Sequence, residues 1–386
     1  GHDVLPLILM VLTAGCLGAT LPLLSHMAIP PDEKTGYKLS WLYFSNILGS
    51  ALGSYLTGFF LLDHLPLVRI ALVLAIIGFA ITAVLLFLSR EGRGFLVTGV
   101  ISMALLTVAF SQVSGSLYDR MYERLILQNK FADGVQFAHI VENRHGVVTV
   151  TEKGTVYGSG LYDGEVNVDL IKDVNYVVRA YSINAFHSSP KKNVLVIGLS
   201  SGSWVQVLAH NPEVEKITVV EINPGYIEII REYERVRSLL NNHKIEIVID
   251  DGRRWLLKNP DKRFDLVIMN TTWHWRAFIT NLLSVEFLNI VRAHLNPGGI
   301  IFYNTTFSDE VQRTGATVFP YAYKFINCLI VSDTPITIDT ERLTRTLSDY
   351  AIDGKPALIL SNPDGKEKLQ EILEIFSSVD QKRPWT

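Results

Sequence analysis

Four apolar runs dominate the first third of the chain and decide what this part can fold into. Each run approaches or exceeds the roughly 20 apolar residues that a helix needs to cross a bilayer. The runs are Val4 to Leu24, Leu39 to Leu62, Pro66 to Leu88 and Phe95 to Val113. They predict a transmembrane region of four helices over residues 1–115, with the lipid bilayer as a partner. We therefore expect an integral membrane protein, located in the bacterial inner membrane.

The flanks of these runs indicate how the chain is oriented. The first run lacks a basic leader and a small-residue cleavage site, so we do not expect a signal peptide. The chain starts at Gly1 without a methionine, which leaves further upstream helices open. Arg120, Arg124 and Lys130 follow the last run, and by the positive-inside tendency they favour a cytoplasmic soluble domain.

The composition of the whole chain excludes several functions. Hydrophobic residues make up 48% of the sequence and charged residues 19%, and the apolar excess lies before Val113. The net charge of -3 gives no basic footprint, so no nucleic-acid partner is expected. Cys16 and Cys328 form neither a disulfide framework nor a metal site, and no metal is expected. The sequence leaves open whether the chain forms a homo-oligomer.

From Asn193 onward, short β-branched runs alternate with helical stretches. This pattern predicts an α/β fold, a Rossmann-like parallel sheet covered by helices. The five expected strands are "NVLVIG", "ITVVEI", "IEIVIDDG", "DLVIMN" and "GIIFYNTT". Each ends in a small or polar residue, and ligands bind along the carboxyl edge of such sheets.

The ends of the first three strands suit a nucleoside. The turn "GLSSGS" allows close backbone approach, and Glu221 lies 23 residues beyond Gly198, where a carboxylate can accept hydrogen bonds from both ribose hydroxyls. Asp251 suits the exocyclic amine of adenine, with a helix cap as the alternative. The candidate nucleoside-binding residues are Gly198, Ser200, Ser201, Gly202, Ser203, Glu221, Ile222, Asp250, Asp251, Gly252, Asn270 and Thr271.

The order of these motifs resembles spermidine synthase and related polyamine aminopropyltransferases, from roughly Phe137 to Asp333. The motifs are "VLVIG", "VEKITVVEINPGYIEIIREY", "IVIDDGRRWL", "FDLVIMNTT" and "LSVEFLNIVRAHLNPGGIIFYN". "YDG" at Tyr162 to Gly164 matches the small amino-terminal β-domain of that family. "GATLPLL" and "LYFSNILGSALGSYLTGFFLL" resemble the membrane segment fused to such domains in many bacteria. The resemblance implies a linker over 116–135, a β-rich subdomain over 136–190 and a methyltransferase-type Rossmann-like domain over 191–386.

The resemblance also implies a chemistry, and the chain departs from it at the acidic positions. The family uses an adenosyl sulfonium and releases methylthioadenosine, with Glu221 on the ribose and Asp251 on the adenine. Ser201 stands where the family has the aspartate that grips the aminopropyl ammonium. Asn270 replaces the general-base aspartate, and Trp273 replaces the second aspartate of the same loop.

These replacements favour a different acceptor and a different nucleoside. An amide neither holds an ammonium charge nor accepts its proton, so putrescine is not the expected acceptor. Loss of the loop aspartate removes a charge that would repel the carboxylate of intact S-adenosylmethionine, while Ser201 and Ser203 can donate to that carboxylate. The candidate catalytic residues are Asn270, His274, Arg276, Tyr181 and Arg179. The alternative for Asn270 is a structural amide in the turn after its strand.

The sequence therefore predicts an integral-membrane, spermidine synthase-like enzyme. It would use S-adenosylmethionine or decarboxylated S-adenosylmethionine and release 5′-methylthioadenosine, by transfer or by lyase-type cleavage of the carbon chain. Three alternatives stay open at this point: a true spermidine synthase using putrescine, a membrane-anchored methyltransferase and a non-catalytic nucleoside sensor.

Overall fold

The computed structural model describes residues 4–88, 93–128, 131, 134–187, 190–270 and 273–377. Two compact units divide the chain, Gly1–Val84 and Leu85–Thr386. The division falls inside the third long helix, upstream of the boundary near residue 115 that the sequence suggested.

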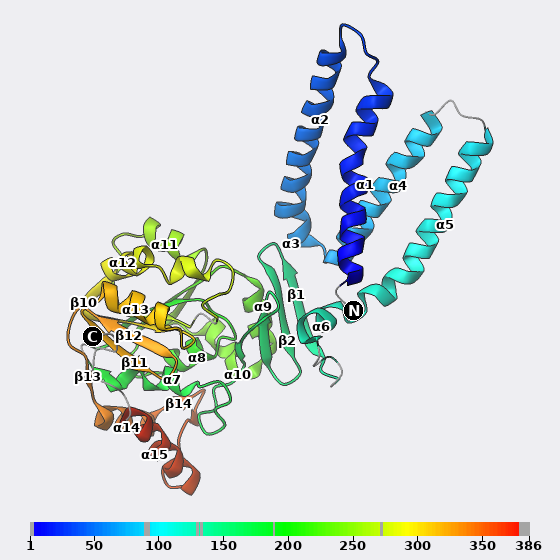
Figure 1. Ribbon diagram of the computed structural model, residues 1–386. Coiled ribbons are helices and arrows are strands. Elements are labelled where there is room, and N and C mark those ends of the chain that lie inside the picture. The colour runs from blue at the N-terminus through cyan, green and yellow to red at the C-terminus, as the bar shows by residue number, and fades with distance from the viewer. Residues whose placement is uncertain are drawn as a thin grey trace. The chain divides into compact units, whose positions relative to one another are not determined.

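Long apolar helices form the first third of the chain (Figure 1). They are α1 (Val4–Ala28), α2 (Thr35–Leu56) continued by a π-helical turn (Thr57–Leu61) and α3 (Leu62–His64), then α4 (Leu67–Leu88) and α5 (Arg93–Tyr118). Among the described residues, three stretches are long and apolar enough to cross a membrane: Met10–Ala28, Thr35–His64 and Leu67–Val84. In α5 the corresponding apolar stretch is the shorter Val97–Val108.

A four-stranded antiparallel sheet opens the remaining part of the chain. The short helix α6 (Met121–Leu127) precedes β1 (Phe137–Asn143), β2 (Gly146–Thr151), β3 (Thr155–Gly158) and β4 (Leu161–Glu165), paired in sequence order. The last four residues of β2 are all buried, and Val148 and Val150 belong to the same hydrophobic core as strands of the main sheet. The short α7 (Val178–Tyr181), a 3-10 turn (Ser182–Ala185) and β5 (Phe186–His187) lead to the main sheet.

The main sheet has seven strands in the order β11-β12-β10-β9-β6-β7-β8. All five expected strands are confirmed and are mutually parallel: β6 (Asn193–Ile197), β7 (Lys216–Glu221), β8 (Ile245–Ile249), β9 (Phe264–Met269) and β10 (Leu295–Asn304). The sequence did not predict the last two strands, β11 (Tyr321–Phe325) and β12 (Cys328–Ser332). The β12 strand runs antiparallel to both of its neighbours.

Helices cover both faces of this sheet, and alternate residues of β6 face opposite cores. Val194 and Val196 belong to one hydrophobic cluster, and Leu195 and Ile197 belong to the other. The covering helices are α8 (Ser203–Ala209), α9 (Gly225–Glu232), α10 (Glu234–Arg237), α11 (Gly252–Lys258), α12 (Val285–Ala293) and α13 (Asp309–Val318). The described chain ends with five further elements. They are β13 (Thr337–Ile338), α14 (Thr340–Asp349), the hairpin of β14 (Ala351–Ile352) and β15 (Lys355–Pro356), and α15 (Pro363–Ser377).

The strand order fixes where a ligand can enter. The chain continues from β6 to β7 and β8 on one side, and returns to β9 and β10 on the other. The loops after β6 and β9 therefore turn away from each other and leave a crevice at the carboxyl edge of the sheet.

Candidate nucleoside site

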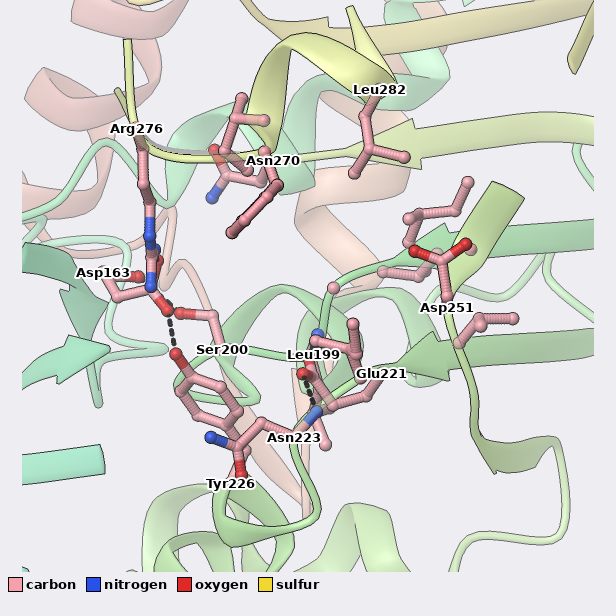
Figure 2. Close-up of a pocket in the computed structure, with 18 of the residues that line it drawn as sticks. Asp163, Leu199, Ser200, Glu221, Asn223, Tyr226, Asp251, Asn270, Arg276 and Leu282 are labelled. Atoms are coloured by element: carbon pink, nitrogen blue, oxygen red, sulfur yellow. Dashed lines mark hydrogen bonds and ion pairs between the residues drawn. The ribbon is translucent and has the colours of Figure 1, made fainter. Parts of the chain in front are cut away.

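A cavity of about 720 Å³ lies at this crevice (Figure 2). Its walls come from the loops that follow β6, β7, β8 and β9, together with His145, Ser159, Leu161 and Asp163 of the small β-subdomain. The predicted residues that line it are Gly198, Ser200, Ser201, Glu221, Ile222, Asp250, Asp251, Gly252, Asn270 and Arg276. The structure thus brings together residues that lie up to 78 positions apart, from Gly198 to Arg276.

The glycine loop after β6 is a tight turn, as expected, but its serines are already engaged. Gly202 has φ +76, and a Cβ there would lie 2.8 Å from Leu239 Cδ2, so only glycine fits. The Ser201 hydroxyl donates to Ser203 Oγ at 3.0 Å, and Ser203 donates to the Glu165 carbonyl at 2.7 Å. Gly202 and Ser203 do not line the cavity. The prediction that Ser203 donates to a ligand carboxylate is therefore wrong, because this hydroxyl ties the loop to β4.

Glu221 is the buried carboxylate at the end of β7. Its side chain accepts hydrogen bonds from the backbone N–H of Leu199 at 2.6 Å and of Asn223 at 2.7 Å. Burial raises the pKa of Glu221 to about 7, although these backbone donors oppose the rise. The carboxylate is thus fixed in place by two loops before any ligand arrives, and its remaining lone pairs can receive two hydroxyls.

The end of β8 confirms that Asp251 caps a helix, and its contact with an adenine amine stays a prediction. Its carboxylate accepts from the Arg254 N–H at 2.8 Å and so caps α11, and the same residue lines the cavity. Asp250 forms an ion pair with Arg254. Ile222 lines the cavity, is 51% exposed and offers an apolar surface to a flat ring.

The segment after β9 divides into a part that faces the cavity and a part that does not. Asn270 lines the cavity, and its Oδ1 accepts from Asn304 Nδ2 at 3.2 Å. Thr271 lies outside the described residues. His274 does not line the cavity, because its ring forms a 2.7 Å hydrogen bond with the Thr306 hydroxyl. The prediction that His274 acts on the substrate is therefore not supported by its placement.

A connected set of three side chains lines the other end of the cavity. Arg276 Nη1 lies 3.0 Å from Asp163 Oδ1, and its Nη2 donates to the Gly158 carbonyl at 2.8 Å. The Tyr226 hydroxyl, on α9, donates to the second oxygen of Asp163. Burial, and then the nearby Asp163 carboxylate, raise the pKa of Tyr226 well above its usual range, so the hydroxyl keeps its proton. Sequence reasoning singled out neither Asp163 nor Tyr226; the "YDG" motif was the available signal for Asp163.

Residues 181–330 match the family model described as the spermine/spermidine synthase domain. That span contains β6 to β11, the start of β12, and the segments that carry Glu221, Asp251 and Asn270. This part of the chain is a spermidine synthase-like domain.

Several known proteins resemble this spermidine synthase-like chain. A polyamine aminopropyltransferase of Mycobacterium tuberculosis (strain ATCC 25618 / H37Rv) is 28% identical over 336 residues, which cover 80% of this chain and 62% of the relative. One of Oceanobacillus iheyensis is 23% identical over 330 residues, which cover 81% and 62%. The chain thus spans about three fifths of the length of these relatives. A solved spermidine synthase in complex with the transition-state analogue AdoDATO matches with a TM-score of 0.48 and 19% identity, covering 61% of this chain and 89% of that one.

Arg179 and Tyr181 are core residues of the spermidine synthase-like domain. Arg179 is 3% exposed and donates to Asn327 Oδ1 and to the carbonyls of Tyr176 and Asn175. The Tyr181 hydroxyl donates to the Val168 carbonyl at 2.7 Å. Neither residue lines the cavity, so their placement does not support the predicted catalytic role.

Nucleoside binding by the spermidine synthase-like domain should depend on pH through Glu221. Its pKa in the folded protein, about 7, lies above the ordinary 4.5. If the ionised form binds the ribose, the affinity for methylthioadenosine should rise about tenfold from pH 6 to pH 8. The stability effect has the opposite sign. The native state holds this proton more tightly, so the contribution of Glu221 to stability is lost as pH rises through about 7.

Calorimetric titrations of methylthioadenosine across this pH range would measure the effect. The Glu221→Gln variant, which has no titrating group at this position, should bind weakly and with a flat profile. An unchanged slope in that variant would assign the pH dependence to another residue.

Proposed function

We propose that the soluble domain binds S-adenosylmethionine or its decarboxylated form and transfers the carbon chain of that nucleoside to an acceptor, releasing 5′-methylthioadenosine. One observation carries the proposal: Gly198, Glu221 and Asp251 lie at or just beyond the ends of successive strands and line one cavity in a spermidine synthase-like domain. The similarity to polyamine aminopropyltransferases supports chain transfer over methyl transfer.

The layout of the cavity supports one orientation of the bound nucleoside. Figure 2 shows Glu221 between Asp251 on one side and Asp163, Asn270 and Arg276 on the other. With the ribose hydroxyls on Glu221 and the adenine amine on Asp251, the sulfonium and its carbon chain extend toward Asn270. The acceptor then approaches at the Asp163 end.

The chemistry needs orientation more than a strong base. A lone pair of the acceptor forms a bond to the chain carbon next to sulfur, and the carbon–sulfur bond breaks. Its electron pair returns to sulfur, which becomes the neutral thioether of methylthioadenosine. Any proton on the acceptor leaves to water. Asn270 cannot take up that proton, but its amide can position the reactants, and positioning alone accounts for large rate effects.

The membrane location is part of the same proposal. Three apolar stretches of sufficient length precede the domain, and they favour an integral-membrane enzyme. The basic residues Arg120 and Arg124 beyond α5 favour a cytoplasmic domain.

Product analysis by mass spectrometry tests the reaction type. The full chain, supplied in turn with each form of the nucleoside, should release methylthioadenosine. Asn270→Ala should lower the rate about tenfold or more with little change in methylthioadenosine affinity, as expected for loss of a positioning hydrogen bond. His274→Ala, in the same loop but outside the cavity, is the matched control and should keep the wild-type rate.

Other outcomes of this experiment would replace the proposal. Accumulation of S-adenosylhomocysteine would indicate a methyltransferase, and binding without turnover would indicate a sensor. Methylthioadenosine released from intact S-adenosylmethionine without any acceptor would indicate lyase-type cleavage. Formation of spermidine from putrescine would establish a true spermidine synthase.

A further inference from the structure

At the acceptor end of the cavity, the protein itself supplies a positive charge, the guanidinium of Arg276. Arg276 comes from the loop after β9 and reaches across to the small β-subdomain, where it meets Asp163 and the Gly158 carbonyl. The side chain is largely enclosed, with 20% exposure for Arg276 and 11% for Asp163. A Cβ at position 158 would lie 2.8 Å from Arg276 Nη2, so the glycine leaves the room that the guanidinium fills.

The carboxylates that line the cavity, within the described part of the chain, already have partners. Glu221 accepts two backbone N–H groups, Asp251 caps α11, and Asp250 pairs with Arg254. Asp163, at the acceptor end, receives both the Arg276 guanidinium and the Tyr226 hydroxyl. An ammonium group that enters this end therefore meets a neutralised carboxylate and a fixed positive charge.

We propose that Arg276 is a built-in counter-ion that selects against cationic acceptors. It occupies the side of Asp163 that an acceptor ammonium would need, so the site takes a nucleophile that carries no positive charge. This inference rests on the proposed transfer reaction and names the class of its acceptor. Arg276 acts here as a specificity determinant, while the nucleoside is held by other residues.

The electrostatic reason is that one carboxylate neutralises one cation. With Arg276 in place, a protonated amine would lose its hydration beside a guanidinium and gain no free counter-charge, which is unfavourable in an enclosed site. The two hydrogen bonds of Arg276 to the β-subdomain hold the guanidinium there. When the Arg276 guanidinium is removed, the enclosed Asp163 carboxylate loses that cation. An ammonium group of a diamine can then take the place of the guanidinium beside Asp163.

Calorimetry of the full chain in detergent or nanodiscs, saturated with methylthioadenosine and titrated with putrescine, tests this. Wild type should show no binding at millimolar putrescine. Arg276→Gln should bind putrescine at least tenfold more tightly, and Arg276→Gln combined with Asp163→Asn should lose that gain. Arg231→Gln removes the same charge from an exposed position of α9 outside this cavity and should behave as wild type.

Two results would overturn the inference. Putrescine binding by wild type in the micromolar range would do so whatever the variants show, and this measurement does not depend on their folding. A folded Arg276→Gln protein that binds methylthioadenosine but gains no affinity for putrescine would also do so, while leaving the proposed function intact. Loss of methylthioadenosine binding by wild type would instead remove the proposed function and this inference together.

Discussion

Replacing Glu221 with alanine should weaken methylthioadenosine binding about 100-fold or more. The carboxylate is placed to accept both ribose hydroxyls, and hydrogen bonds to a charged group contribute about 1.5–3 kcal/mol each. The substitution also leaves the backbone N–H groups of Leu199 and Asn223 without their acceptor, which loosens the two loops that form the cavity wall. Isothermal titration calorimetry at pH 8 would measure the loss.

Glu228→Gln is the matched control for this variant. Glu228 lies on α9, is exposed and does not line the cavity, so removal of its charge should leave the affinity within about twofold of wild type. If Glu221→Ala kept wild-type affinity, the nucleoside would have to bind elsewhere, and the proposed function would lose its main support.

Replacing Arg179 with methionine should destabilise the protein by about 3 kcal/mol, the typical result when a buried hydrogen-bond network loses its central member. Asn327 Oδ1 and the carbonyls of Asn175 and Tyr176 would lose their donor. The guanidinium also lies 5.0 Å from the Trp204 ring, a contact that methionine replaces only in part. Urea unfolding followed by circular dichroism would measure the change.

The same variant separates a structural role from a catalytic one. At a temperature where Arg179→Met remains folded, its affinity for methylthioadenosine should stay within a few-fold of wild type, since Arg179 does not line the cavity. Arg235→Met, at an exposed position of α10, should change stability by less than about 0.5 kcal/mol. A stable Arg179→Met protein with abolished turnover would return this residue to the catalytic candidates.

The five parallel strands were predictable because each is a short apolar run bounded by turn residues, a pattern that depends on local sequence alone. The hairpin of β11 and β12 was not predicted. "YAYKF" and "CLIVS" have strand composition, but only the pairing with β10 shows that they extend the same sheet and reverse its direction.

The site was predictable where its residues follow strands directly, as Glu221, Asp251 and Asn270 do. It was not predictable where contacts join distant segments. Asp163 and Arg276 are 113 positions apart, and no local pattern pairs them. Arg179 and His274 show the reverse error: charged or titratable residues near a motif suggested chemistry, but the fold directs one into the core and the other to Thr306.

The hydrogen bond between Asn143 and Asn223 couples the stability of the small β-subdomain to nucleoside binding. Asn143, at the end of β1, donates to the Asn223 side chain at 2.7 Å, and the backbone N–H of Asn223 donates to Glu221. Docking of the β-subdomain and occupancy of the ribose position thus share one residue. By linkage, the free energy that the nucleoside gains from a firmly held Asn223 must raise the free energy of opening the β1–β2 hairpin by the same amount, detectable as greater protection of its amides from hydrogen exchange.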